Sequence, residues 1–479
     1  MNKPIRRLAV FSMALFGVLL LNITWIQGFQ ADALREHEFN SRQFVESLTQ
    51  ARGAILVGSE EIAFSEPVGG DSDQYQREYE NGQLYAPVTG AFRAGSATGI
   101  EKAENSLLDG SDDRLAVSNF LDTITGKEKK GANVELTVNA EAQQAAMDGF
   151  NELGQNGAAV ALDPSTGAVL ASYSNPTYDP NDVASVTETS EAAENWTSLE
   201  GSEQQPLLNR GLNERYPPGS TFKIVTASAA LEDGHTPEST QEAPASLDLG
   251  APMFNASRQP CNGGSPDTLA HSIEISCNTS MANWAIDLGA EKMTEQADAY
   301  GFNQGSFDIP LPVTESLYPS ESDNNILGRS GIGQGNVEAT PLQMAMVAAG
   351  VANDGDVMKP YLVESVKDSD LSEIKSASPE VFSTAVSAKT AEDLTQMMIL
   401  VTEGAEGSGL GGAIDGMQVA GKTGTAETSS GPTHNWFISF APADDPQVAV
   451  AVVVEHGGGS GGTLAAPIAK RIMEAVINE

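Results

Sequence analysis

The chain has 479 residues, of which 40% are hydrophobic and 19% charged. Its length is enough for two or three domains, and its composition is typical of an ordered globular protein. Against 65 aspartates and glutamates it has 26 lysines and arginines, a formal charge of −39, which makes nucleic acid a very poor partner. Two cysteines and five scattered histidines exclude a disulfide-rich scaffold and a four-cysteine metal site. We therefore expect no metal and no cofactor.

A long apolar run near the N-terminus is the strongest feature of the composition. Three basic residues precede Leu8–Ile26, which carries no charged side chain and is about long enough to cross the ~30 Å hydrocarbon core as a helix. Trp25 lies at its far end, where an indole prefers the membrane interface. We expect residues 1–27 to be a cytoplasmic tip and a single-pass anchor in the cell membrane, with the rest of the chain extracytoplasmic. A cleaved signal peptide is the alternative, but no clear small-x-small cleavage site follows.

Residues 28–155 are expected to form a separate, extended pedestal. Short strands at Ala54–Val57 and Glu61–Phe64 are joined across a turn, and the strand-like Val134–Val138 precedes a helix at Glu141–Leu153. No residue cluster in this region suggests catalysis. We therefore expect it to serve spacing, docking or dimerisation.

From residue 156 to residue 479 the pattern predicts an α+β domain. Ala158–Leu162 and Val169–Tyr173 form a hairpin, and the acidic segment Asp179–Gln205 is predicted to be a long loop. The predicted helices are Thr221–Leu231, Asp267–Glu274 with Ser265 as its cap and Pro266 at its first position, one through Met281 and Leu288, one from Thr340-Pro341, one from Ser387 to about Val401, and a closing helix from about Ala465. Late strands at Gln418–Gly421, Trp436–Phe440 and Val448–Val454 are expected to join the hairpin in one sheet.

The first candidate for chemistry is the pair Ser220 and Lys223. The preceding Pro-Pro-Gly makes a sharp entry, so the helix begins at or just after Ser220. Its Oγ then lies near free backbone N–H groups at the positive end of the helix dipole. Lys223 lies on the same face, close enough to exchange a proton with Oγ, and becomes a useful base only if its pKa is lowered. An N-cap serine followed by a surface lysine is the alternative.

Two further groups complete the candidate set. Between two predicted helices, Ser276 can relay a proton and the amide of Asn278 can orient the lysine and a substrate amide; a simple helix cap is the alternative. The other group consists of Lys422, Thr423, Gly424 and Thr425 and comes at the end of a predicted strand. A surface turn after the strand is the alternative.

The strand group has features that suit a substrate with a carboxylate. Gly424 lets a substrate backbone approach the strand edge. Lys422 and the hydroxyls of Thr423 and Thr425 supply a cation and donors for the carboxylate. The N–H of Thr425 joins that of Ser220 as an oxyanion hole, in which loss of one donor usually costs roughly 10²–10³ in rate.

In this order the three motifs resemble those of class B penicillin-binding proteins, the monofunctional D,D-transpeptidases, and especially the actinobacterial ones. The resemblance covers about residues 40–60 and, densely, 133–479. Further matches come at Arg52–Ile55, Ala159–Gly167, Asn209-Arg210, Tyr216–Ser220, Gly333–Gly335 and Trp436–Pro442. Two departures stand out: the Arg-Gly motif lacks the usual Asp-Arg-x-Gly after it, and Cys277 is the middle residue of the second motif.

The resemblance implies a penicillin-binding, serine β-lactamase-like transpeptidase domain, with an antiparallel sheet flanked by helices and an all-helical subdomain. It implies cross-linking of peptidoglycan stem peptides that end in D-Ala-D-Ala, through an acyl-enzyme at Ser220, and inhibition by β-lactam antibiotics. We expect no glycosyltransferase domain before the pedestal. A cell-wall synthesis complex with a separate glycan polymerase is therefore implied.

Two other functions remain as alternatives. A D,D-carboxypeptidase or β-lactamase would hydrolyse the acyl-enzyme and need a placed base, for which the acidic loop offers Glu191, Glu194 and Glu200 without a motif. A non-catalytic scaffold or β-lactam sensor would keep the fold alone, but all three motifs are intact.

The two cysteines are expected to form a disulfide. Export places Cys261 and Cys277 in an oxidising compartment, and a short, Gly-containing segment separates them. A closed loop of this length would stabilise the fold by roughly 3 kcal/mol. Two unrelated buried thiols are the alternative.

Overall fold

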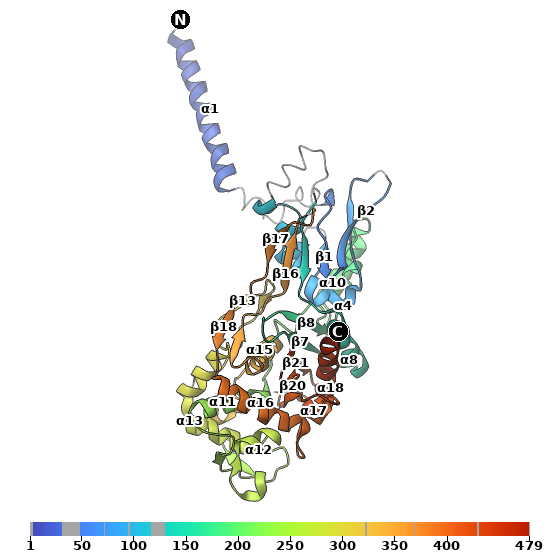
Figure 1. The fold of residues 1–479 in the computed structure, drawn as a ribbon. Helices are drawn as coiled ribbons and strands as arrows, with labels where there is room; N and C mark the ends of the chain where they lie inside the picture. Colours follow the sequence, from blue (N-terminus) through green and yellow to red (C-terminus); the bar gives the residue numbers. More distant parts are fainter. Residues whose placement is uncertain are drawn as a thin grey trace.

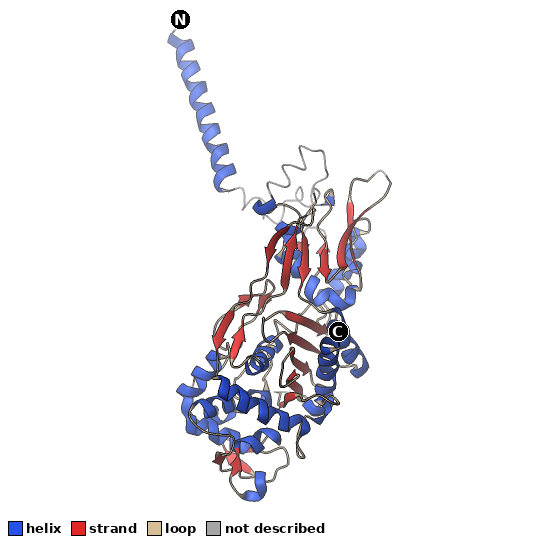
Figure 2. Ribbon diagram, viewed as in Figure 1, coloured by secondary structure: helices blue, strands red, loops and turns tan. Residues whose placement is uncertain are grey.

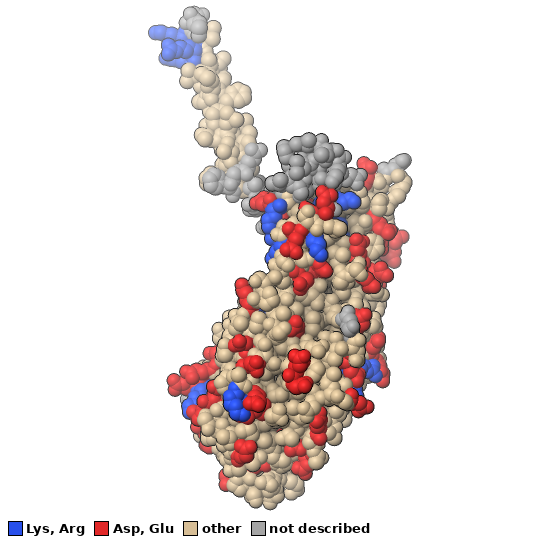
Figure 3. Space-filling model, viewed as in Figure 1, with Lys and Arg blue, Asp and Glu red and all other residues tan. Residues whose placement is uncertain are grey.

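The computed structural model of the chain describes residues 3–30, 48–70, 72–93, 96–115, 130–320, 323–368, 370–428 and 431–478. Of the predicted pedestal, residues 31–47 and 116–129 lie outside this set. Two sheets with their helices follow the N-terminal helix (Figures 1 and 2). Asp and Glu outnumber Lys and Arg on the face shown in Figure 3 and spread over it without forming a single block.

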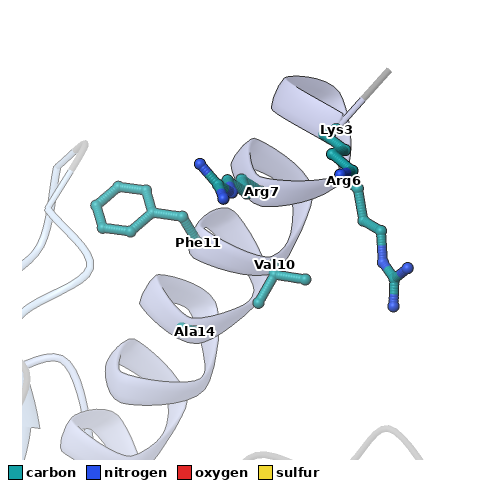
Figure 4. A pocket seen from close by; sticks show the side chains of 6 residues that line it. All are labelled: Lys3, Arg6, Arg7, Val10, Phe11 and Ala14. Atoms are coloured by element: carbon teal, nitrogen blue, oxygen red, sulfur yellow. The ribbon is translucent and has the colours of Figure 1, made fainter. Parts of the chain in front are cut away.

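The N-terminal helix α1 spans Lys3–Phe29. Within it, Lys3–Ile26 is 24 residues long and apolar enough to cross a membrane, and none of its most apolar window is buried against the protein. Figure 4 shows Lys3, Arg6 and Arg7 together at its first turns, with the apolar residues beginning directly after them. One helix long enough for the predicted span is therefore present among the described residues.

The first sheet is six-stranded, in the order β17-β16-β6-β1-β2-β3. The predicted hairpin and the predicted third strand are both confirmed within it. Two of its strands come from beyond residue 156, so the pedestal sheet is completed by the later part of the chain. The strands are β1 (Ile55–Val57), β2 (Glu60–Pro67), β3 (Tyr75–Tyr79), β6 (Asn133–Leu136), β16 (Val363–Lys367) and β17 (Glu373–Ser376).

A buried ion cluster fastens this sheet to its short helices. Glu101 lies on α5 and accepts from Arg52 Nη2 at 2.8 Å and from Arg77 Nε at 2.6 Å. The two arginines hold the pKa of Glu101 below its usual range against the opposing effect of burial. The surrounding elements are α4 (Gly82–Thr89), β4 (Phe92–Arg93), β5 (Ser96–Ala97), α5 (Gly99–Ala103), α6 (Asn105–Leu108) and the 3₁₀ turn η1 (Asp113–Leu115).

The second sheet is five-stranded and antiparallel, in the order β19-β20-β21-β7-β8. It joins the early hairpin to the late strands, as predicted. Its central strands β20 and β21 are buried along their whole length because helices cover both faces. The strands are β7 (Gly157–Leu162), β8 (Val169–Asn175), β19 (Ala420–Ala426), β20 (His434–Ala441) and β21 (Val448–Val454).

The two faces of this sheet are packed against different helices. On one face, Val450 and Val452 share a core with Phe150 of α8 (Ala140–Leu153) and Ile472 of α18 (Ala466–Ile477). On the other, α15 (Pro341–Ala352) packs against β21 and β7. Although α8 falls before residue 156, it packs on the sheet of the later domain.

Most of the remaining helices form a helical subdomain beside β19, and Thr340 and Ser387 cap their helices as predicted. These elements are η2 (Gly219–Phe222), α11 (Lys223–Glu232), η3 (Cys261–Gly264), α12 (Leu269–Glu274), α13 (Asn278–Ala299), α14 (Asn324–Ser330), α16 (Ala388–Glu403), η4 (Leu410–Gly412) and α17 (Gly461–Leu464). Small hairpins border them: β9 (Thr240–Gln241) with β12 (Asp267–Thr268), β10 (Ser246–Asp248) with β11 (Pro252–Phe254), β13 (Phe307–Asp308) with β14 (Pro312–Val313), and β15 (Asp356–Met358) with β18 (Val381–Thr384).

Three local predictions are wrong. The helix predicted at Asp267–Glu274 begins at Leu269 with Thr268 as its cap, because the two residues before it pair with β9 instead. The segment Asp179–Gln205 contains two helices, α9 (Asn181–Ala184) and α10 (Thr189–Glu200). The strand predicted to end at Gly421 runs on to Ala426, because it pairs with β20 as far as His434.

Candidate active site

Ser220 lies in the 3₁₀ turn η2, directly before α11, and its side chain is half-buried. The turn is entered through Gly219, which has φ of 55° and donates its N–H to Gly333 O at 3.0 Å. A Cβ on Gly333 would lie 2.1 Å from Gly219 O, so the first glycine of the Gly-Gln-Gly segment is required because it touches the serine turn. Thr425 of β19 approaches from the other side, since a Cβ on Gly219 would lie 2.8 Å from Thr425 O.

Lys223 begins α11 and is completely buried. Its Nζ contacts Ser276 O at 2.7 Å, Ser276 Oγ at 3.2 Å and Asn278 Oδ1 at 2.7 Å. Although both residues are described, the structure records no hydrogen bond between Lys223 and Ser220. The lysine is therefore held mainly by the second motif, and Ser276 and Asn278 do come together with it as predicted.

Lys422 lies within β19 and is also completely buried. Its Nζ donates to Ser276 Oγ at 2.9 Å and to Thr423 O at 3.1 Å. The Ser276 hydroxyl therefore lies between the two lysine ammonium groups. The three motifs, far apart in the sequence, thus converge on this one oxygen.

The electrostatics of the two lysines differ. Burial, and then the charge of Lys422, hold the pKa of Lys223 well below its ordinary value. Burial alone lowers the pKa of Lys422 to about 7. The lowered pKa makes Lys223 easier to deprotonate than an ordinary lysine, which suits it to act as a base, and a pKa of about 7 makes the charge of Lys422 sensitive to pH near neutrality.

The rest of β19 forms the edge of the sheet next to Ser220. Thr423 shares a hydrogen bond of 2.8 Å with Ser408, and Thr425 is exposed. A Cβ on Gly424 would lie 2.9 Å from both Pro218 O and Trp436 Cβ. Gly424 is therefore required for the strand to pack against the serine turn, in addition to leaving the edge open to a substrate.

The turn that carries Ser276 is held by a residue that the sequence did not single out. Ser276 has φ of 61°, which is uncommon for a residue other than glycine. Asn255 Oδ1 accepts from the N–H groups of Asn278 at 3.1 Å and Thr279 at 3.0 Å, and so caps α13 from a separate loop. The disulfide between Cys261 and Cys277 closes the same loop, with 6.3 Å between the two Cα atoms, which confirms the predicted bond.

Two further residues support the site. Trp436 is among the residues that carry the family resemblance, whereas Ser408 is not predicted from the sequence. Trp436 Nε1 donates to Pro217 O at 3.0 Å and fixes the entry to the serine turn. Ser408, in a glycine-rich segment, carries no local signal of its contact with Thr423.

Two features suggested other chemistry in the sequence, and the structure places both in structural surroundings. Glu191, Glu194 and Glu200 lie on α10, which packs through Trp196 against Tyr178 and α4, and the Trp196 indole donates to Glu200 at 2.5 Å. Among the described residues, one group has metal-like spacing, Cys261 and Cys277 with Asp267, but both sulfur atoms are used in the disulfide.

The fold and the site together define a serine acyl-transferase of the penicillin-binding type. Residues 157–474 match the penicillin binding protein transpeptidase domain, and residues 52–134 match the penicillin binding protein A dimerisation domain. The chain is 42% identical to the peptidoglycan D,D-transpeptidase PbpA of Mycolicibacterium smegmatis over the full length of both. It is 40% identical to PbpA of Mycobacterium tuberculosis, over 100% of this chain and 99% of that protein.

Solved structures give the same result. The ceftriaxone acyl-enzyme complex of penicillin-binding protein A from M. tuberculosis has a TM-score of 0.86 and 39% identity, over 90% of this chain and 100% of that one. The D,D-transpeptidase domain of a peptidoglycan glycosyltransferase from Eggerthella lenta has a TM-score of 0.77 and 34% identity, over 90% and 99%. The chain belongs to the penicillin-binding protein transpeptidase family. The predicted fold and the predicted class, a β-lactam-inhibited, serine-type peptidoglycan D,D-transpeptidase, are confirmed.

Proposed function

We propose that this enzyme cross-links stem peptides ending in D-Ala-D-Ala through a covalent bond to Ser220. The observation that carries the proposal is the convergence of two buried lysines on Ser276 Oγ, beside a serine at the start of a helix. In this arrangement Lys223 serves as a base of lowered pKa and Lys422 as a cation, and both act on the nucleophile Ser220.

In the first half-reaction, Ser220 Oγ attacks the carbonyl carbon of the penultimate D-alanine, and its proton passes to neutral Lys223. The N–H groups of Ser220 and Thr425 stabilise the developing oxyanion. Lys422, with the hydroxyls of Thr423 and Thr425, holds the terminal carboxylate. That carboxylate raises the pKa of Lys422 and keeps it charged.

The C–N bond to the terminal D-alanine then breaks, and the leaving amine takes the proton from Lys223 through Ser276 Oγ. Asn278 holds Lys223 through its Oδ1, while its Nδ2 donates to Phe254 O at 2.9 Å and keeps a second N–H for a substrate carbonyl. In the second half-reaction, an acceptor amine attacks the ester carbonyl and loses its proton along the same path. Ser220 recovers its proton as it leaves.

The location of the enzyme, its division into domains and its partner are also proposals. The basic residues at the start of α1 favour the cytoplasmic side, and the disulfide suits an oxidising compartment, so we place the catalytic domain outside the cell membrane. We propose that residues 1–27 form the anchor, residues 28–155 the pedestal and residues 156–479 the transpeptidase domain. The two matched domains are a transpeptidase domain and a dimerisation domain, and we propose that a separate partner polymerises the glycan that this enzyme cross-links.

Fluorescent penicillin tests the assignment of Ser220. We expect wild-type enzyme to be labelled and to keep its label for many minutes, since no motif singles out a deacylating base and the glutamates of α10 are exposed. Ser220→Ala should abolish labelling while its thermal melt stays within a few degrees of wild type. Labelling that persists in Ser220→Ala would remove the assignment, and rapid release of hydrolysed drug would favour a hydrolase.

A further inference from the structure

A short loop beside the active site carries a cation whose role the mechanism leaves open. Residues 254–261, here called the rim loop, follow β11 and end at Cys261. They lie at the end of the molecule furthest from β1 and β2 (Figure 1). The loop begins where Phe254 O accepts from the Asn278 amide at 2.9 Å, so its first residue is one hydrogen bond from the catalytic motif.

Phe254 and Arg258 form a stacked pair on this loop. The Phe254 side chain is 41% exposed, and the Arg258 guanidinium carbon lies 4.7 Å from the centre of its ring. Arg258 is exposed and has φ of 54°, a conformation that few residues other than glycine adopt. Stacking on a ring orients a guanidinium and leaves its N–H edge available to a planar anion.

Arg258 has no recorded ion pair although the protein is strongly acidic. The chain has 65 acidic residues against 26 basic ones, and the structure records no ion pair for Arg258 among the residues it describes. Two other described arginines outside α1 also lack one: Arg93 stacks on Trp196 and Arg329 donates to Ala251 O. The remaining six each pair with a carboxylate: Arg52, Arg77, Arg114, Arg210, Arg215 and Arg471.

The rim loop is fixed in place. Asn255 holds it from within, since its Nδ2 donates to Pro244 O and Gln259 O at 2.9 Å each while its Oδ1 caps α13. Arg329 Nη2 donates to Ala251 O at 2.7 Å and anchors the turn between β10 and β11. The disulfide ties the far end of the loop to Cys277. The loop is therefore preorganised, which lowers the entropic cost of binding a ligand there.

We propose that Arg258, stacked on Phe254, is a specificity-determining residue that binds a carboxylate of the donor stem peptide upstream of its D-Ala-D-Ala end. The inference rests on the proposed function, in which Asn278 and Lys422 hold the donor on either side of Ser220. The donor then meets two cations: Lys422 binds its terminal carboxylate and Arg258 binds a second anionic group.

Two synthetic peptides test this subsite in the full-length, detergent-solubilised enzyme. Both end in D-Ala-D-Ala, and they differ only in one upstream side chain, which is a carboxylate in the first and its primary amide in the second. The measurement is the concentration of each peptide that halves the rate at which fluorescent penicillin labels Ser220. A charge-assisted hydrogen bond at an exposed site predicts that wild type prefers the carboxylate peptide about tenfold.

Arg258→Gln should bind the two peptides within about twofold of each other, while Arg258→Lys should keep part of the preference, since it retains charge but not the planar fork. Arg114→Gln makes the same chemical change at an exposed arginine of the pedestal and should keep the wild-type preference for the carboxylate peptide. The rate of labelling without peptide checks that each variant is folded. Equal binding of both peptides by wild type, or an unchanged preference in Arg258→Gln, would overturn the subsite. Absence of labelling in wild type would instead refute the proposed function.

Discussion

The protonated, buried side chain of Lys422 is expected to destabilise the folded protein. Burial lowers its pKa from 10.5 to about 7, and each pKa unit corresponds to about 1.4 kcal/mol. A proton on this side chain is therefore about 5 kcal/mol less favourable in the folded chain than in the unfolded one. Lys422→Met keeps much of the length of the side chain and removes the charge, so it should relieve this cost.

The hydrogen bonds of Lys422 reduce the expected gain. The substitution leaves Ser276 Oγ and Thr423 O without the bonds of 2.9 Å and 3.1 Å that Nζ donates, at about 1 kcal/mol each. The net expectation is that Lys422→Met is about 3 kcal/mol more stable than wild type at pH 6. Penicillin labelling should at the same time be strongly reduced, because the cation for the drug carboxylate is gone.

The sign of the pH dependence follows from the direction of the pKa shift. Between pH 7 and pH 10.5 the unfolded chain holds the Lys422 proton more often than the folded chain, so the stability of wild type rises with pH in this window. Below pH 7 both states are protonated and the full cost applies. The advantage of Lys422→Met should therefore be largest at about pH 7 and below, and it should disappear near about pH 9. At about pH 10.5 the variant should be less stable than wild type, because only the loss of the two hydrogen bonds then remains.

Melting temperatures of the full chain in detergent at pH 6, 8 and 10 measure this difference. Lys359→Met is the matched control, because the side chain of Lys359 is 52% exposed and its loss should change the melt little at any pH. The reasoning would be refuted if Lys422→Met melted at or below wild type at pH 6. An offset that stayed constant with pH would also refute it.

Two further predictions concern the base and the disulfide. Lys223→Arg keeps the charge but cannot become a neutral base near pH 7, so labelling by fluorescent penicillin should be lost as fully as in Lys223→Ala; a wild-type rate would show that Lys223 is not the base. Native protein that is unfolded without reductant and then alkylated should gain no alkyl group by intact mass, and two added groups would show that Cys261 and Cys277 are not bonded. Replacing both cysteines by serine should lower the stability by roughly 3 kcal/mol and slow labelling, because the bond restrains the turn at Ser276.

The sequence predicts the chemistry of the site better than its geometry. Each motif is short and local, and the order of all three is specific enough to show that Ser220, Ser276 and Lys422 belong to one site. That Ser276 Oγ contacts both lysines, and that Asn255 caps the helix behind it, depends on contacts between segments far apart in the chain. No periodicity or spacing encodes such contacts.

The errors in the fold have the same origin. Strand β16 pairs with β6, as in Val366 with Val134, across more than two hundred positions of sequence. Helix α10 is poor in apolar residues and rich in acidic and hydroxyl side chains, which led to the prediction of a loop, and packing of Trp196 on Tyr178 and Arg93 stabilises it. Strand β19 extends through Lys422 and Gly424 because β20 pairs with it there, although glycine at that point disfavours a strand.

The active site combines several features that each oppose folding. No carboxylate among the described residues pairs with either of the two buried lysines, and Ser276 adopts a left-handed conformation that costs about 1 kcal/mol or more for a residue other than glycine. Such a site persists only where the surrounding contacts determine it independently. Here the Asn255 cap and the disulfide fix the backbone directly after Ser276, at Cys277, Asn278 and Thr279. Because these supporting groups lie in the rim loop, the loop that would bind the donor is also the loop that holds the catalytic hydroxyl between its two lysines.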